Sequence, residues 1–446
     1  MVRFLLVVCR MQVSAIFLLV FAWSQSCVGQ AKQVDADWLA AEMPKLMEDY
    51  LWLHQNPELS FQEVETSAFF AESLRRIGFS VSSRIGGLGV VGVLENGDGP
   101  MLMLRSDLDA LPVTEQTQLP YASTQKVVTD GGVETGVMHA CGHDLHLTNL
   151  LGTARFLASH RSIWAGTLMV IGQPAEERGA GAKLMLEDGL FKRFGRPDFA
   201  VALHCSSNKP VGQIGLHAGY AMANVDSVDI SVKGRGGHGS QPQDTVDPVV
   251  QAAQLVIDLQ TIVSREISPL DPAVVTVGSI HGGTKHNIIG NQCDLQLTVR
   301  SYSDSVREKL LSSIRRKAIA VASSYNAPEP DVVVSEGTPS LKNDPELSVR
   351  LRAVFASVIG QENVTNDDPW MAGEDFSRYG RAGVPIVMYW LGTVSEERLS
   401  RYEQLGVSPP SLHSALYYPD AAEALDTGIR TMTAAALDLL QRSSSR

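Results

Sequence analysis

The chain of 446 residues is longer than one ordinary domain, which indicates two domains or one large α/β unit that carries an insertion. Its apolar fraction of 44% and charged fraction of 19% are typical of a globular protein and exclude a largely disordered one. The formal net charge is −12, and no run of lysine and arginine is long enough to follow a phosphate backbone, so nucleic acid is not an expected partner.

Residues 1–30 have the pattern of a secretory signal peptide. Two arginines flank short apolar runs, the apolar stretch 13–23 reads VSAIFLLVFAW, and small polar residues follow it. This stretch is too short for a comfortable membrane span, and cleavage is expected between Ser26 and Ala31. An uncleaved membrane anchor is the alternative. The sequence therefore predicts a secreted or periplasmic protein, or one of the secretory-pathway lumen in a eukaryote, without a stable membrane span after cleavage.

Three cysteines remain after such cleavage, namely Cys141, Cys205 and Cys293. An odd number does not require a complete set of disulfides, even in an oxidising compartment. This favours a metal ligand or a buried thiol at Cys141 over one half of a disulfide.

Strands and helices alternate in the next part of the chain. Apolar runs at 101–109, 166–177 and 198–205 predict buried strands, and helices are expected at 144–160 and 179–194. Strands that alternate with helices are typical of a largely parallel sheet that is covered on both faces.

The order of elements changes between residues 224 and 335. The expected order there is strand, helix, strand, strand, helix, strand, which is ferredoxin-like. Strands are predicted at 225–234, 273–283, 291–301 and 331–337, and helices at 247–266 and 303–325. The second helix carries apolar residues along one face, at Val306, Leu310, Ile314 and Val321. We therefore expect a small domain, 224–335, inserted into a discontinuous large domain formed by 31–223 and 336–446.

The stretch MHACGHDLH, residues 138–146, concentrates histidine, cysteine and aspartate in a few positions. Cys141 and His143 are two residues apart, so their side chains point to the same side if the chain is extended just before a helix. Such a pair can bind a metal ion. In the alternative interpretation, Asp144 caps the following helix and His143 is an ordinary surface histidine. This stretch alone leaves both interpretations open.

Further potential ligands follow the predicted strands. Glu176 and Glu177 come directly after a buried strand, and His204 lies at the end of the next one. In a parallel sheet these positions meet at the carboxyl edge, where one carboxylate can bind a metal while its neighbour holds a water. With the cysteine and histidine above and with His413 near the C-terminus, they are enough to hold two divalent ions. Each of them, taken singly, could instead be a capping or core residue.

Several motifs in matching order resemble one family. They are RSDLDALP, MHACGHD, GQPAEERGAGAKLMLEDGLF, GGHGSQP, VDPVVQAAQLVIDLQTIVSRE, VVTVGSIHGGTKHNIIGNQ and MAGEDFSRY, and the similarity extends from about Trp38 to Leu440. The chain resembles the aminoacylase and carboxypeptidase superfamily of dinuclear metallohydrolases, and best its amidohydrolase branch, which includes hippurate hydrolases and auxin-conjugate hydrolases. The resemblance implies an α/β fold: a zinc-peptidase-like catalytic domain with a mixed, mostly parallel sheet, plus an inserted ferredoxin-like α+β lid that also forms a homodimer.

The resemblance implies roles for individual residues of the catalytic domain. Two divalent ions, zinc or manganese, would be bound by Cys141, His143, Glu177, His204 and His413. Glu176 would be the general base, and Asp107 would orient a ligand as a supporting carboxylate. Arg105 stands where more distant relatives carry a metal-binding histidine, as is usual in this branch.

The resemblance also implies three functional side chains in the lid. His238 would complete the active site of the neighbouring subunit as an oxyanion donor, and Asn287 and Arg300 would hold the substrate carboxylate. Two stretches depart from the family pattern: HNIIGNQ lacks the proline that commonly follows the asparagine, and HSALYYPD lacks the usual His-Ser-Pro. These departures bear on the lid geometry and on the acyl-group preference.

The sequence therefore predicts a metal-dependent amidohydrolase that cleaves N-acyl amino acids or related small conjugates, with a metal-activated water and Glu176 as general base. A dipeptidase or carboxypeptidase of the same superfamily is the first alternative. The second is a secreted metal- or ligand-binding protein without catalysis, which would need neither Glu176 beside Glu177 nor His238 on the lid. The stretch GLGVVG (87–92) has the glycine spacing of a dinucleotide site, but no helix pattern follows it, so we expect a strand or hairpin there.

Overall fold

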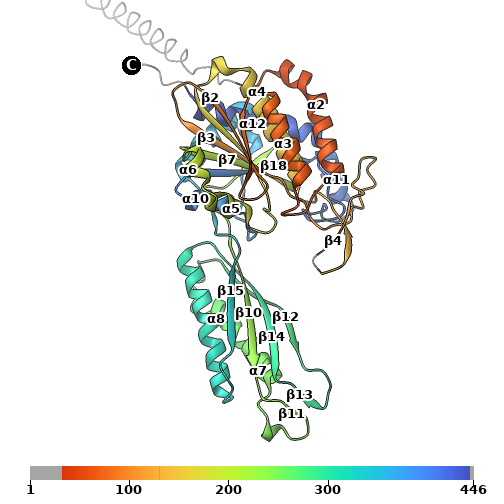
Figure 1. The fold of residues 1–446 in the computed structure, drawn as a ribbon, viewed down its shortest axis with the longest axis vertical. Coiled ribbons are helices and arrows are strands. Elements are labelled where there is room, and N and C mark those ends of the chain that lie inside the picture. Colours follow the sequence, from red (N-terminus) through yellow and green to blue (C-terminus); the bar gives the residue numbers. More distant parts are fainter. Residues whose placement is uncertain (1–32, 130, 442–446) are drawn as a thin grey trace, which may run out of the picture.

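The computed structural model describes residues 33–129 and 131–441, so the predicted signal peptide lies outside the described residues. The described chain forms a large unit, built around a sheet with helices on both sides, and an elongated small unit that extends from it (Figure 1). None of the helices in these two ranges combines the length and the apolar character that a membrane span requires.

The large unit contains an eight-stranded sheet with the strand order β1-β2-β6-β3-β7-β18-β8-β17. Its strands are β1 (Ser80–Ile85), β2 (Gly89–Asn96), β3 (Met101–Asp107), β6 (Gly166–Gln173), β7 (Phe199–Pro210), β8 (Ile214–Leu216), β17 (Val364–Asn366) and β18 (Ile386–Val394). The central strands β6, β3, β7 and β18 are parallel, whereas β1, β2 and β8 introduce antiparallel pairs. The prediction of a mixed, mostly parallel sheet is confirmed, and GLGVVG lies in the β1–β2 hairpin.

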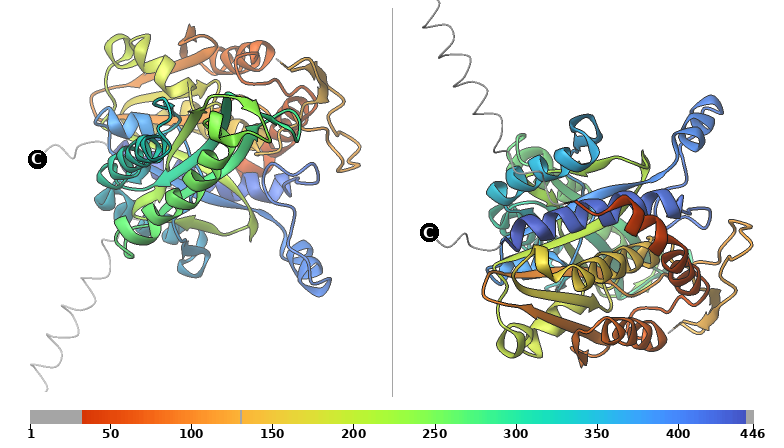
Figure 2. Two further views of the ribbon diagram at one scale, coloured as in Figure 1. Left: turned by 90° about the horizontal axis from the view of Figure 1, so that it is seen from below. Right: turned by 90° about the horizontal axis from the view of Figure 1, so that it is seen from above.

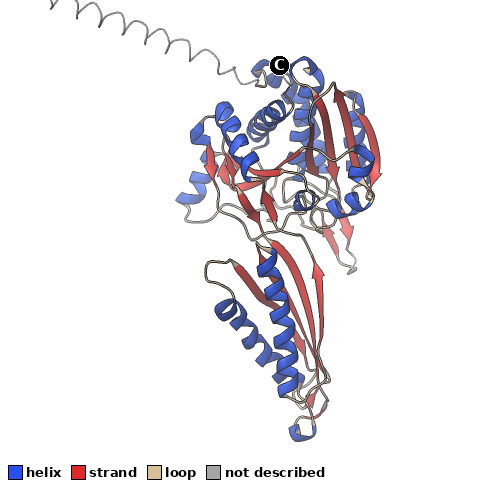
Figure 3. Ribbon diagram, turned by 90° about the vertical axis from the view of Figure 1, so that its left-hand side faces the viewer, coloured by secondary structure: helices blue, strands red, loops and turns tan. Residues whose placement is uncertain are grey.

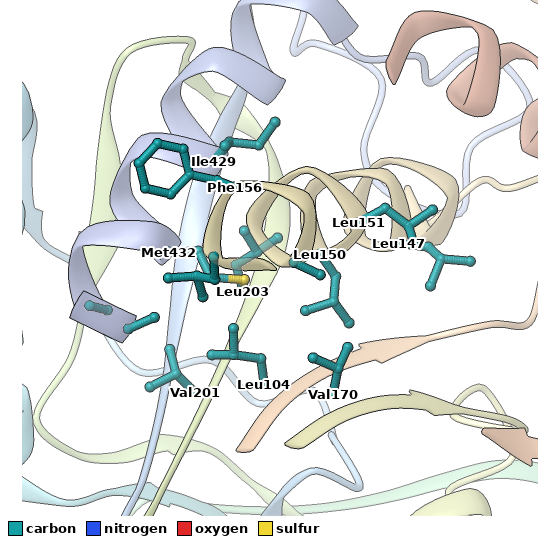
Figure 4. Packing of buried hydrophobic residues seen from close by; sticks show 14 of the residues in the cluster. Leu104, Leu147, Leu150, Leu151, Phe156, Val170, Val201, Leu203, Ile429 and Met432 are labelled. Carbon is teal, nitrogen blue, oxygen red and sulfur yellow. The ribbon is translucent and has the colours of Figure 1, made fainter. Parts of the chain in front are cut away.

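Alternate residues of the central strands face two separate cores, as the period of a strand requires. Leu102 and Leu104 of β3 belong to the core under α2 (Ala36–Gln55), α3 (Val64–Arg76), α4 (His143–Ser159), α9 (Pro345–Ile359) and α12 (Ala421–Leu439). Figure 4 shows leucines of α4 packed over apolar side chains of the strands in this core. Met103 faces the opposite core, under α5 (Gly181–Glu187), α6 (Leu190–Phe194) and α10 (Ser377–Arg381).

Two predicted elements of the large unit differ from the structure. The single helix expected at 179–194 is two helices, because Gly189 adopts φ +83° between α5 and α6 and breaks the helical hydrogen bonding. The strand expected to reach residue 177 ends at Gln173, and a turn follows at 176–179. Ala175, directly before this turn, has φ +51°, a conformation that a strand does not allow.

The small unit has the ferredoxin-like order and consists of β10 (Asn224–Lys233), α7 (Pro248–Thr261), β12 (Ala273–Gly282), β14 (Gln292–Ser301), α8 (Asp304–Ser324) and β15 (Asp331–Glu336). Its antiparallel sheet has the order β12-β14-β10-β15. Both helices pack on one face of this sheet, and the other face carries no helix (Figure 3). The four apolar residues predicted along one face of α8 are all buried. The short strands β11 (Gly237–His238) and β13 (Ile288–Ile289) form the tip that lies away from the large unit (Figure 1).

The remaining elements are short. The chain enters the small unit through β9 (Gly219–Met222) and leaves it through β16 (Leu341–Asn343), and these two strands pair with each other. The hairpin of β4 (Lys126–Val128) and β5 (Glu134–Gly136) and the helix α11 (Glu396–Gln404) extend outward from the large unit (Figure 2). Helical turns occur at Arg161–Ile163, Pro242–Asp244, Ile262–Glu266 and Gln361–Asn363.

Candidate metal centre

Five side chains that the sequence analysis considered for metal binding lie together at the carboxyl edge of the large sheet. The Sγ atom of Cys141 lies 3.5 Å from Nε2 of His204 and 3.3 Å from Nε2 of His413. Glu177 Oε1 lies 3.5 Å from the same nitrogen of His413 and 3.9 Å from Nε2 of His143. Cys141 thus belongs to two groups of three potential ligands, one with both His143 and His204 and one with Glu177 and His413.

The donor atoms of this cluster fit divalent metal ions. His143 Nε2 and Glu177 Oε1 are buried and make no hydrogen bond within the described residues. The other ring nitrogen of His143 lies 2.8 Å from the backbone oxygen of Asp109, which accepts its proton and leaves Nε2 available as a ligand. Thiolate, imidazole and carboxylate are the groups that bind zinc in proteins, and two sets of them around one cysteine are consistent with two ions.

The local structure decides between the two interpretations of MHACGHD. The N-cap of α4 is Gly142 in a left-handed conformation (φ +81°), and a Cβ there would lie 2.8 Å from the sulfur of Cys205. His143 is the first residue of the helix and is fully buried, so it is not a surface histidine. Asp144 does not cap the helix, and its carboxylate instead lies 2.7 Å from Nδ1 of His54. The capping interpretation is therefore wrong, and a glycine turn, in place of extended chain, points Cys141 and His143 to one place.

Buried carboxylates surround the imidazole of His143. Burial by itself would lower its pKa, but Asp107 and Asp109 raise the pKa of His143 to about 10. Asp107 also accepts hydrogen bonds from His146 Nδ1 at 2.8 Å and from Arg105 Nη1 at 2.7 Å. Asp107 is thus fixed by partners on α4 and β3, and its role as a supporting carboxylate stays a prediction.

Glu176 lies beside this cluster with its side chain in a pocket of negative charge. Burial, then the carboxylates of Glu374 and Glu177, raise the pKa of Glu176 well above its ordinary range. Oxygens of Glu176, Glu374 and Asp375 all lie within 4.8 Å of one another. A carboxyl group in this environment holds a proton more tightly than an exposed one, which suits a group that accepts and returns a proton.

Arg105 compensates part of this charge. Its buried guanidinium is 2.9 Å from Glu374, 3.1 Å from Asp375 and 2.7 Å from Asp107. Sequence reasoning did not assign roles to Glu374 and Asp375, although both lie in the quoted motif MAGEDFSRY. It also missed Asp109, which follows the strand that carries Asp107. The only signal for all three was an acidic residue inside a motif of the family.

The structure separates the three residues expected in the lid. Arg300 of β14 lines the cleft between the two units and is half-buried. His238 and Asn287 are exposed and belong to the tip of the small unit, at the far end from the large sheet (Figure 1). Within one chain, the structure therefore brings Arg300 to the site but not His238 or Asn287.

The cleft that contains the candidate metal centre has a volume of about 1440 Å³. Cys141, Glu176, Glu177, His204 and His413 lie in its wall. Trp390 lines it next to His204, because the two residues are in register on the neighbouring parallel strands β18 and β7. A further apolar part of the wall is formed by Met222, Trp370, Met371 and Leu412.

This fold and this cluster define a metallohydrolase of the zinc-peptidase type with an inserted α+β unit. The family model described as Peptidase family M20/M25/M40 matches residues 103–412, and the chain belongs to this family. It is 36% identical over 350 residues to the thermostable carboxypeptidase 2 of Saccharolobus solfataricus, and this match covers 78% of this chain and 85% of the relative. It is 39% identical over 331 residues to the hippurate hydrolase of Campylobacter jejuni, or 73% of this chain and 82% of the relative.

A solved structure agrees with this assignment. A dinuclear metal binding peptidase of the M20 family from Bacillus subtilis superposes with a TM-score of 0.73 and 30% identity, covering 90% of this chain and 99% of that one. The chain is therefore a metal-binding hydrolase of the M20 family, and the recognition made from its motifs is confirmed. The comparisons do not assign roles to individual residues, so the roles of the candidate site residues stay predictions.

Proposed function

We propose that the protein hydrolyses the amide bond of N-acyl amino acids or related small conjugates. The observation that carries this proposal is the cluster of five potential ligands around Cys141, with Glu176 beside it in a cleft that also contains Arg300. A binding protein without catalysis would not need a buried carboxyl group next to the ligands. The relative named hippurate hydrolase supports an N-acyl amino acid as substrate, because hippurate is N-benzoylglycine.

We assign two divalent ions to Cys141, His143, Glu177, His204 and His413. When bound, such ions acidify a water molecule and polarise the amide carbonyl. The backbone oxygen of Asp109 orients the imidazole of His143, because it accepts a hydrogen bond from Nδ1. Zinc suits the thiolate and imidazoles, and manganese suits the carboxylate, so metal analysis of the purified enzyme decides between them.

Glu176 acts as the general base in this proposal. Its carboxylate takes a proton from the attacking water and gives it to the departing amine, a role that contributes about 10²–10⁴ in rate. Arg105 keeps the neighbouring carboxylates Glu374 and Asp375 in place by direct ion pairs. It thereby limits the repulsion around Glu176 without neutralising Glu176 itself.

The cleft provides separate surfaces for the two halves of the substrate. Arg300 offers a guanidinium that can bind a free carboxylate with two hydrogen bonds. The apolar wall formed by Met222, Trp370, Trp390 and Leu412 suits the acyl group. We expect N-benzoyl and other bulky N-acyl amino acids to be cleaved faster than N-acetyl ones, and amides of the same amino acids to be poor substrates.

A dipeptidase or carboxypeptidase activity is the second candidate, since a relative is named thermostable carboxypeptidase 2. The same cleft would then bind a peptide with a free amino group in place of an acyl group. Hydrolysis of matched pairs such as N-benzoylglycine and phenylalanylglycine by the metal-loaded enzyme separates the two activities. A clear preference for the dipeptide would make the protein a dipeptidase, and no hydrolysis of either class would contradict the proposed function.

We further propose a homodimer in which the small unit is the lid. In one chain His238 lies at the tip, so it reaches an active site only in a second copy. β12 is an edge strand of its sheet and exposes Ile280, and α7 exposes Val249, Val250 and Ile257. An unpaired edge strand beside an exposed apolar helix is a suitable surface for a second copy.

The homodimer can be tested by refolding inactive variants together. Glu176→Ala and His238→Ala proteins should each be inactive alone. Activity should return when the two are unfolded and refolded as a mixture, because one site of the mixed dimer then has both groups. Mixed dimers without activity would show that His238 does not act on the neighbouring subunit.

The location of the protein is also a proposal. We infer that the predicted signal peptide exports the chain, so that it acts as a secreted or periplasmic enzyme or in the secretory lumen of a eukaryote. Sequencing of the N-terminus of the exported protein tests this directly. A start between residues 27 and 31 is expected, since cleavage was predicted between Ser26 and Ala31.

A further inference from the structure

A strained residue lies directly before the turn that carries Glu176. Ala175, directly before the proposed base, has φ +51°, which is unfavourable for any residue with a Cβ atom. It is fully buried and follows the last residue of β6 by two positions. Strained backbone of this kind persists only where surrounding contacts hold it, and such positions concentrate at functional sites.

Besides local backbone hydrogen bonds to the carbonyls of Ala175 and Glu176, a contact from a distant loop holds this segment. The backbone N–H of Ala175 donates a hydrogen bond of 2.7 Å to Oε1 of Glu63, which lies between α2 and α3 and is fully buried. The same loop supports the next residues of the turn as well. Ser60 donates a 2.6 Å hydrogen bond to Asp109 Oδ2, and this oxygen accepts the backbone N–H of Glu177 at 3.0 Å.

The side chain of Glu63 does not cap α3, although Glu63 occupies the N-cap position of this helix. Glu63 is the N-cap residue of α3, where a carboxylate commonly accepts a hydrogen bond from the first helical turn, yet it makes no such bond. Glu58 performs that function, because its Oε2 accepts both the backbone N–H and the hydroxyl of Thr66 at 2.8 Å. Phe61 between these two glutamates has φ +68°, so the loop that carries Glu63 is itself strained.

We propose that Glu63 is a positioning residue, which fixes the carboxylate of Glu176 through its hydrogen bond to the backbone of Ala175. This inference rests on the proposed role of Glu176 as general base. Glu63 touches neither substrate nor metal ligands, and it acts only through the conformation of the turn. Without the bond, the N–H of Ala175 would be buried and unsatisfied, and the strained turn could relax and move Glu176.

Three substitutions separate hydrogen bonding from charge and from packing. Glu63→Gln keeps a carbonyl oxygen as acceptor and should retain kcat within about threefold of the original enzyme. Glu63→Met fills a similar volume without an acceptor, and kcat should fall by at least about tenfold while KM and metal content stay unchanged. Glu63→Asp keeps the charge but withdraws its oxygens by one methylene, so kcat should fall in this variant too. It provides the same test if Glu63→Met folds poorly. Glu58→Met is the matched control, because it removes a partly buried acceptor from the same loop and should lower stability without lowering kcat.

The measurements combine kinetics with a readout that does not need activity. The substrate is N-benzoylglycine, or the fastest member of a panel of N-benzoyl and N-acetyl amino acids, and metal content is measured by mass spectrometry. Amide hydrogen exchange of the peptide that covers 173–177 should be faster in Glu63→Met and Glu63→Asp than in the original protein and in Glu58→Met. The proposal would be overturned if Glu63→Met changed neither the exchange rate nor kcat. It would also be overturned if Glu63→Met lost its metal, or if kcat fell as much in Glu63→Gln as in Glu63→Met. An inactive original enzyme with the expected exchange pattern would instead contradict the proposed function and leave the hydrogen bond from Ala175 N–H to Glu63 as a structural support of the turn.

Discussion

His54 of α2 allows a quantitative test of the buried charges behind the metal centre. Its Nδ1 lies 2.7 Å from Asp144 and its Nε2 lies 3.3 Å from Glu115. Burial alone would lower the pKa of His54, but the two carboxylates raise it from 6.5 to about 9. Because the folded-state pKa is higher than the unfolded one, the stability from this charge is complete below pH 6.5 and is lost as the pH rises through 9. At 1.36 kcal/mol for each pKa unit, the loss is about 3 kcal/mol.

We expect that His54→Gln no longer loses this part of its free energy of unfolding as the pH rises. The free energy of unfolding would be measured by urea titration of the metal-saturated original protein and of the variant between pH 6.5 and 9.5. The difference between the two should shrink by about 3 kcal/mol over this range. His281→Gln, the same change at an exposed histidine of β12, is the control for the substitution itself. A constant difference for His54→Gln would show that the histidine is neutral in the folded protein and would refute the reasoning.

Three further predictions concern catalysis. Glu176→Gln should lower kcat by about 10²–10⁴ with metal content and KM unchanged, and loss of metal in this variant would mean that the roles of Glu176 and Glu177 are exchanged. Chelators should abolish activity and Cys141→Ala should strongly weaken metal binding in equilibrium dialysis, because its sulfur lies within 3.5 Å of two imidazole nitrogens; full activity of the metal-free enzyme would contradict this. Arg300→Ala should reduce kcat/KM for N-acyl amino acids by at least about tenfold and leave the slow hydrolysis of their amides nearly unchanged, whereas an equal loss on both would show that Arg300 does not bind the carboxylate.

Much of the fold could be predicted because its signals are local. The apolar face of α8 and the order of elements in the small unit depend on signals between neighbouring residues, and both agree with the structure. The break at Gly189 was missed because glycine alone does not reveal a left-handed conformation between two short helices. Distinguishing one helix from two required the tertiary position of α6.

The sequence predicted candidate residues that lie in recognisable motifs, but not those that act through contacts with distant parts of the chain. His143 is the first residue of α4, as the helix pattern indicated, whereas β7 continues to Pro210, so His204 lies within this strand and not at its predicted end. Glu63 and Asp109 had no such signal, because each acts on the backbone of a residue more than 60 positions away in sequence. Long-range contacts of this kind cannot be read from periodicity.

The backbone conformation of the site could not be predicted, because two of its residues are strained. Ala175 and His413 both have positive φ angles, +51° and +66°, although neither is a glycine, and sequence preference would predict against both. Ala175 is held by Glu63, and the backbone N–H of His413 is held by the carbonyl of Ala140, at 2.9 Å. Ala175 directly precedes Glu176 and His413 is itself a candidate ligand, so the unfolded chain has no preformed site at either position. Metal binding should therefore be coupled to folding, since the ligands converge only when the contacts that hold the strained residues have formed.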